Sequence, residues 1–190
     1  VAALAQGIAP AAILRGVQVA DRAYALGWWD WLTPFSILTG VAVVIGYCLL
    51  GATWLVMKTT GDLREKAYHL SWWLLFAMLG AIGAVSLATP FLDVEYARRW
   101  FTWPNLLFTA PVPIAVAAVT ALLLQSLAQR RDYRPFVLSL VLFALSYAGL
   151  GISMYPYIVP RSTTIWQAAA PEGSQLFMLV GVSILIPIIL

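Results

Sequence analysis

Long windows without Asp, Glu, Lys or Arg constrain this chain more than any other feature. Four such windows cover residues 31–57, 67–92, 100–129 and 135–160, and a fifth runs from 173 to 190. Each of the first four exceeds the roughly 20 residues that a helix needs to cross a hydrocarbon core about 30 Å thick. The windows therefore predict a protein that crosses a membrane several times.

The spans are predicted to be helices, because unpaired backbone groups cannot face lipid and the windows lack the two-residue alternation of a membrane barrel. The expected fold class is all-α, a polytopic transmembrane helix bundle, with one transmembrane domain over 1–190 that is a fragment of a larger bundle. We expect residues 1–14 to be the tail of an earlier helix, and further spans on both sides of the chain. The spans are placed at about 34–57, 69–89, 105–128, 136–156 and 174–190.

Two prolines affect where the helix of the third span is expected to start. Pro111 and Pro113 fall inside its expected first turns, so this helix either starts later than 105 or is kinked there.

Composition excludes several classes of protein. Hydrophobic residues make up 62% of the chain and charged residues 10%, against about 25% charged residues in soluble domains. The net charge of +3 is small and dispersed, so no nucleic-acid partner is expected. The single cysteine, Cys48, excludes an intrachain disulfide and is expected to be a small buried apolar residue.

Basic residues in the connections predict the orientation. The short connections 58–66 and 129–134 hold six Lys and Arg residues, whereas the other three connections hold five: Arg15, Arg22, Arg98, Arg99 and Arg161. Both short connections are therefore predicted to be cytoplasmic. Aromatic residues that prefer the headgroup level cluster on the other side: Trp28, Trp29, Trp31, Trp100, Phe101, Trp103, Tyr155 and Tyr157.

Among Asp, Glu, Lys, Arg and His, only His69 lies within the predicted spans, near the start of the second. It is interpreted as an interfacial residue, with proton exchange to the cytoplasm and a ligand role as alternatives. Two-histidine haem ligation within the chain is impossible, and Met78 and Met154 are interpreted as packing residues. No catalytic residue and no metal site are predicted, and cofactor-binding residues stay unknown.

Other charged residues have structural interpretations. Asp30 is expected to cap the first span or to interact with its helix dipole, and Lys58 to snorkel at its inner end. The segment 92–99 carries both signs of charge, and it is either a solvated loop or a docking point for a partner subunit.

Two long motifs resemble one family. The first comprises WDWLTPF at 29–35, GYCLLGATWL at 46–55 and KTTG at 58–61. The second comprises MYPYIVP at 154–160, TIWQAAAP at 164–171 and FMLVG at 177–181. Together they resemble subunit II of cytochrome bd-type ubiquinol oxidases, cyanide-insensitive relatives included. Cys48 and Thr60 depart from the family pattern, which has Ala and Glu at these positions.

The resemblance implies a function that the residues alone do not give. A complex of this family oxidises a quinol and reduces dioxygen to water in the respiratory chain of a bacterial inner membrane. Its b- and d-type haems belong to subunit I, the expected partner, so this chain is expected to bind no haem. A structural quinone occurs in the second subunit of some members, and a small accessory subunit and membrane lipid are further candidate partners. A secondary transporter and a non-redox membrane scaffold are the alternatives.

Overall fold

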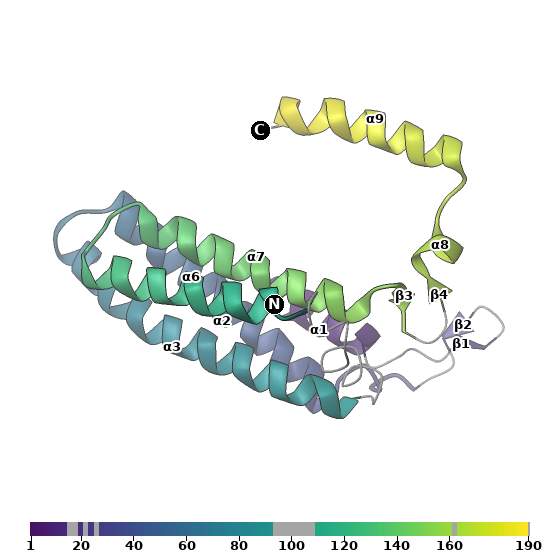
Figure 1. Cartoon of the computed structure of the whole chain (residues 1–190), viewed down its shortest axis with the longest axis horizontal. Coiled ribbons are helices and arrows are strands. Elements are labelled where there is room, and N and C mark those ends of the chain that lie inside the picture. Colours follow the sequence, from purple (N-terminus) through teal and green to yellow (C-terminus); the bar gives the residue numbers. More distant parts are fainter. Residues whose placement is uncertain (15–18, 21–22, 25–26, 93–108, 161–162, 190) are drawn as a thin grey trace.

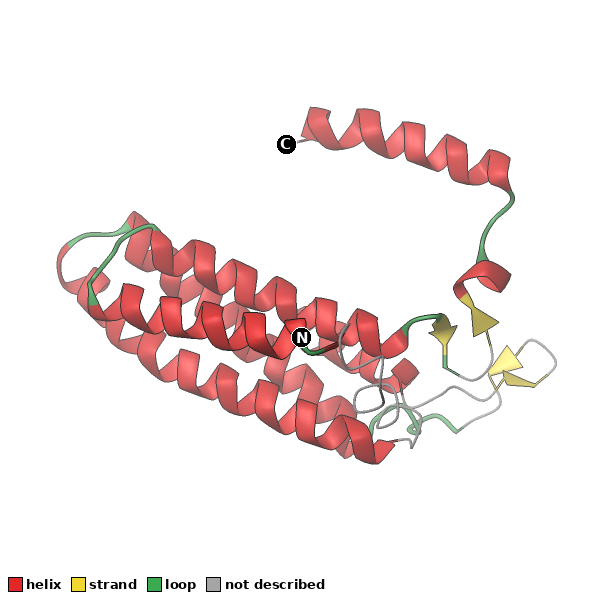
Figure 2. Cartoon of the chain, in the orientation of Figure 1, coloured by secondary structure: helices red, strands yellow, loops and turns green. Residues whose placement is uncertain are grey.

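The structure is a computed structural model that describes residues 1–14, 19–20, 23–24, 27–92, 109–160 and 163–189. Helices dominate it, and two short antiparallel strand pairs lie outside the helical bundle (Figure 2). The helices are α1 (Ala2–Leu14), α2 (Pro34–Lys58), α3 (Gly61–Leu92), α6 (Pro111–Ala128), α7 (Arg134–Met154), α8 (Ile165–Ala168) and α9 (Glu172–Ile189). The strands are β1 (Val19–Ala20), β2 (Ala23–Tyr24), β3 (Tyr157–Val159) and β4 (Thr163–Thr164).

Within the described residues, five helices are long and apolar enough to cross a membrane: α2, α3, α6, α7 and α9. The predicted fold class, an all-α polytopic membrane protein, is therefore confirmed. Helix α3 begins at Gly61, well before residue 69, because its first two turns are charged and hydropathy does not register them as part of a span. The connection between α2 and α3 is therefore only two residues, 59–60.

The prolines of the third span lie at a helix start. Helix α6 begins at Pro111, which places Pro111 and Pro113 in the first turn, where an N–H has no partner within the helix. The described part of this span thus agrees with a late start, and residues 105–108 lie outside the described ranges.

Helices α1, α2, α3, α6 and α7 form the bundle (Figure 1). Its main core is apolar and draws on four of these helices: Leu49 and Val56 from α2, Leu75 and Met78 from α3, Leu123 and Leu127 from α6, and Leu142 from α7. The side chain of Met78 is therefore a packing residue. Met154 packs against a second cluster at the other end, formed by Ala11, Leu14 and Phe35.

Close helix contacts depend on glycine. A Cβ at Gly7 of α1 would lie 2.6 Å from the carbonyl oxygen of Thr39 and 2.7 Å from the Cα of Gly40, so α1 and α2 meet backbone to backbone. A Cβ at Gly46 would lie 2.7 Å from a ring carbon of Phe143 on α7. Only residues without a side chain allow these approaches, as is common between membrane helices.

One hydrogen bond joins two helices inside the core. The hydroxyls of Thr53 on α2 and Ser139 on α7 lie 2.9 Å apart, and both residues are buried. Either hydroxyl can be the donor to the other, and the accepting hydroxyl then donates to a carbonyl of its own helix, Leu49 for Thr53 or Phe136 for Ser139. The pair therefore links α2 to α7 without leaving a donor unsatisfied in the apolar core.

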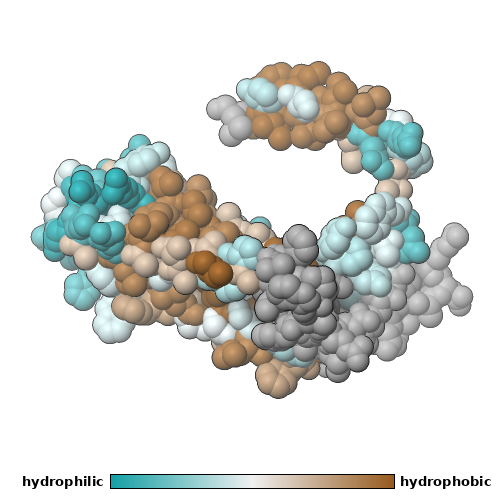
Figure 3. Space-filling view, viewed as in Figure 1, coloured by the Kyte–Doolittle hydropathy of each residue, from teal (hydrophilic) through white to brown (hydrophobic). Residues whose placement is uncertain are grey.

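Helix α9 lies apart from the bundle (Figure 1). All of its residues are exposed, and its surface is almost wholly apolar (Figure 3). The described residues therefore give α9 no packing partner.

Candidate functional site

Two short connections meet at one end of the bundle, at the left of Figure 1. One is 59–60 together with the first two turns of α3, and the other is the turn 129–133 between α6 and α7. These are the two basic connections that were predicted to lie on the same side of the membrane. Hydrophilic residues gather at this end of the molecule, beside the apolar surface of the helices (Figure 3).

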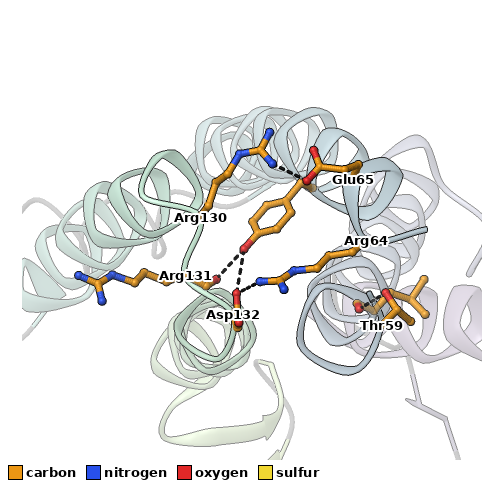
Figure 4. A network of polar contacts seen from close by, with 8 residues as sticks. Thr59, Arg64, Glu65, Arg130, Arg131 and Asp132 are labelled. Atoms are coloured by element: carbon orange, nitrogen blue, oxygen red, sulfur yellow. Dashed lines mark hydrogen bonds and ion pairs between the residues drawn. The ribbon is translucent and has the colours of Figure 1, made fainter. Parts of the chain in front are cut away.

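Two ion pairs join these connections (Figure 4). Arg64 pairs with Asp132, and Arg130 pairs with Glu65. Each pair takes its arginine from a different connection, so the two pairs cross between the start of α3 and the α6–α7 turn. The side chain of Arg64 is 27% exposed, whereas the other three are more than half exposed.

Tyr68 lies between the two ion pairs. This residue is 5% exposed, and its hydroxyl donates to the backbone carbonyl of Arg131 at 3.1 Å. The guanidinium carbons of Arg64 and Arg130 lie 5.7 Å and 5.5 Å from the ring centroid, within the range of cation–π interactions. The ring thus anchors the turn through its hydroxyl and both arginines through its faces.

The turn itself ends α6 in a Schellman motif. The N–H of Arg130 donates to the carbonyl of Leu127, and the N–H of Arg131 donates to that of Ser126. Arg130 has a φ of 51°, the left-handed conformation in which glycine is usual. This backbone conformation is unfavourable for arginine. The Arg130 side chain forms an ion pair with Glu65 and lies over the ring of Tyr68.

The charge of Arg130 is secured by its partner. The hydrogen bond that the Arg130 guanidinium donates to Glu65, followed by the charge of that carboxylate, raises the pKa of the guanidinium. The Arg130 guanidinium therefore stays protonated and keeps its ion pair with Glu65. Chemically, the paired network can hold the two connections together.

The residues singled out in the sequence lie elsewhere. His69 follows Tyr68 on α3 but is exposed and contributes nothing to the network. No group of three or more His, Cys, Asp or Glu residues that could hold a metal occurs within the described residues. Lys58 lies with its Nζ 5.3 Å from the Trp54 ring, at the end of α2.

Two expectations were wrong. Cys48 is exposed on the surface of α2 rather than buried, because a membrane helix is apolar on every face and hydropathy does not show which face is covered. Asp30 does not cap α2, whereas its alternative interaction with the helix dipole stays a prediction. Its carboxylate accepts from the N–H of Gly27 at 2.5 Å, and Thr33 caps the helix in a reciprocal capping box with Ser36.

Several expectations lie outside the described residues. They concern Arg15, Arg22, Arg98, Arg99, Arg161, the aromatic residues Trp100, Phe101 and Trp103, and nearly all of the segment 92–99.

The sequence reasoning missed Tyr68 and the crossed ion pairs. The signal was partial, because both basic connections also contain carboxylates and were assigned to one side. Which carboxylate meets which arginine depends on how α3 and α6 are rotated, and the sequence did not specify that rotation.

Comparisons with known proteins agree on one family. The chain is 26% identical over 196 residues to cytochrome bd-I ubiquinol oxidase subunit 2 of Escherichia coli K12, covering 88% of this chain and 52% of that protein. It is 25% identical to a probable cytochrome oxidase subunit 2 of Haemophilus influenzae, covering 95% of this chain and 56% of that protein. The chain thus spans about half the length of the curated relatives it matches. The family model for cytochrome bd terminal oxidase subunit II matches residues 1–190, so the chain belongs to that family.

Proposed function

We propose that this chain is part of the haem-free second subunit of a cytochrome bd-type terminal oxidase in a bacterial inner membrane. The observation that carries the proposal is the family match over the whole chain. The complex would oxidise two quinols to quinones and pass four electrons and four protons to one dioxygen, which yields two water molecules.

The residues of the chain support a role without haem. Haem iron takes His, Cys, Met or Tyr ligands. The one His, His69, is exposed beside the charged end, Met78 is sealed in the apolar core, and Met154 packs against the second cluster. We therefore assign the b- and d-type haems to the partner, subunit I, and no catalytic residue to this chain.

The bundle itself suits a supporting subunit. Its core is apolar, its glycines bring α1, α2 and α7 together, and its charged residues lie at an end rather than at mid-depth in the described helices. A secondary transporter needs polar groups at the midplane, usually beside a broken helix. The described spans provide no charged group there, so the transporter alternative has no observation in its favour.

The test uses the full-length parent protein, purified by a tag from its native membrane in mild detergent. A dithionite-reduced minus air-oxidised visible spectrum and a quinol oxidase assay are recorded on the purified material. We expect b- and d-type haem bands, a copurifying larger subunit and quinol-dependent oxygen uptake. The polypeptide of this chain, separated from the larger subunit, should show no haem band.

Two results would contradict the proposal in different ways. Haem that stays with the separated polypeptide would refute the haem-free assignment and leave the oxidase function intact. Purified material without haem and without quinol oxidation would refute the oxidase function itself. Fractionation of inner and outer membranes, followed by detection of the tag, tests the proposed location.

A further inference from the structure

The charged end of the bundle has more positive charge than its own carboxylates can balance. Residues 58–66 and 129–134 hold six basic and three acidic side chains. Glu65 forms an ion pair with Arg130, and Asp132 forms one with Arg64. The α6–α7 turn also carries Arg131 and Arg134, and neither forms an ion pair with any carboxylate in the described parts of the chain.

These two arginines border one hollow. Residues 129–134 line an open depression on the outside of the turn, and all of them are exposed. The Arg131 side chain extends away from the network, although its backbone carbonyl accepts from Tyr68 (Figure 4). Its one side-chain contact within the turn is a long hydrogen bond from Nε to the Gln129 amide oxygen, at 3.4 Å. The guanidinium thus remains largely available to a ligand.

The acidic side chain in the hollow does not cancel the charge. Asp132 lines it, but its carboxylate is paired with Arg64 from α3. The network therefore has two effects on the turn: it fixes the backbone through Tyr68 and Arg130, and it neutralises the carboxylate that would repel an anion. Helix α7 begins at Arg134 without a side-chain cap, and a helix start also favours negative charge.

The position of the α6–α7 turn relative to the membrane indicates which anion can reach it. Helices α6 and α7 are candidate membrane spans that end at Ala128 and begin at Arg134, so the turn lies at the border of the hydrocarbon. Tyr133, 65% exposed beside the hollow, is a residue type that prefers this depth. The anions concentrated at headgroup depth are the phosphates of lipids, and guanidinium groups bind phosphate through two parallel hydrogen bonds.

We propose that the α6–α7 turn is a docking surface for the headgroup phosphate of an anionic phospholipid, bound by Arg131 and Arg134. The lipid tails lie along the apolar outer surfaces of α6 and α7. The proposal requires that these helices span a membrane, but it does not depend on the oxidase function.

The test uses the full-length protein in its native complex, reconstituted into nanodiscs of phosphatidylcholine. Trace amounts of photoactivatable phosphatidylglycerol or photoactivatable phosphatidylcholine are added, and the cross-linked peptides are identified by mass spectrometry. We expect phosphatidylglycerol to label the peptide around 129–137 in preference to phosphatidylcholine. Labelling should fall about fivefold for each arginine removed in Arg131→Gln and Arg134→Gln, the loss expected for one basic residue at a charged membrane surface.

Lys58→Gln is the matched control, because it removes one positive charge at the same end of the bundle from a residue that lies over Trp54. It should leave labelling of the turn unchanged. The size-exclusion profile of each purified variant is recorded in parallel, so that loss of the complex is distinguished from loss of lipid binding.

Three outcomes would overturn the proposal. Equal labelling of the turn by the two lipids would show no preference for negative charge. Unchanged labelling in the double variant would show that Arg131 and Arg134 do not bind the headgroup. Loss of labelling on addition of millimolar inorganic phosphate, at constant ionic strength, would identify a soluble anion instead of a lipid as the preferred occupant.

Discussion

Gly46 offers a sharp test of how α2 packs against α7. A Cβ at this position would lie 2.7 Å and 2.8 Å from two ring carbons of Phe143, and 3.5 Å from the terminal carbon of Met78. Ordinary contacts between carbon atoms are about 3.5–4.0 Å. Gly46→Ala therefore requires the ring or the helix to move by about 1 Å.

The ring has little freedom to move. Phe143 lies between the rings of Tyr47 and Tyr147, at centroid distances of 5.1 Å and 5.2 Å. Overpacking of this kind costs about 1–3 kcal/mol. Alanine also favours the helix over glycine by about 1 kcal/mol, so the packing cost must be separated from the helix propensity.

Gly51 provides that separation, because it lies on the same helix and has no atom within 4 Å of its would-be Cβ. Gly51→Ala should be neutral or stabilising. Gly46→Ala should be less stable than Gly51→Ala by about 1–3 kcal/mol, the overpacking term. Unfolding of the full-length protein by sodium dodecyl sulfate, from mild detergent micelles, measures both free energies.

A second substitution tests the cause. Phe143→Leu removes the ring edge that the new methyl group would strike. In the Gly46→Ala background it should therefore cost less than in the wild type, with a coupling energy of about 1 kcal/mol or more. Equal stability of the two alanine variants, or additive effects of Gly46→Ala and Phe143→Leu, would refute the close contact between α2 and α7.

Three further predictions use the same unfolding measurement. A double-mutant cycle of Thr53→Val and Ser139→Ala should give a coupling energy of about 0.6 kcal/mol and at most about 1.7, as for other hydrogen bonds between membrane helices; a coupling of zero would exclude the bond. Thr33→Ala should destabilise by about 1 kcal/mol through loss of the α2 cap, whereas Asp30→Ala should not; the reverse order would reinstate Asp30 as the cap. Arg130→Val should be less stable than Arg130→Gly by about 1–2 kcal/mol, because a β-branched residue resists the left-handed backbone; equal stabilities would show that the turn adopts another conformation.

The fold class could be predicted because the membrane imposes it. Windows without charge longer than about 20 residues permit few structures other than helices. The start of α3 could not be placed in the same way, since hydropathy marks the border of the hydrocarbon and Gly61 marks the first hydrogen-bonded turn. The start of α6 at Pro111 could have been predicted, because proline is favoured at the first position of a helix.

The charged network was only partly predictable. The sequence identified the two basic connections, but the pairing of Arg64 with Asp132 joins residues far apart in the chain. The same ambiguity produced the error at Cys48, which neighbours the buried Leu49 on a helix that is apolar all round. The error at Asp30 was avoidable, because Thr33 and Ser36 flank the proline that opens α2 and can cap it reciprocally.

The isolation of α9 has a consequence for biosynthesis. The bundle contacts of α2 are made with α1, α3 and α7, and those of α6 chiefly with α7, so every helix of the bundle precedes α9 in the chain. The bundle can therefore close in the membrane as soon as α7 has left the translocon, while α9 is still being synthesised. The element contacts that hold the described bundle do not involve α9, so its closure does not require α9 to be in the membrane.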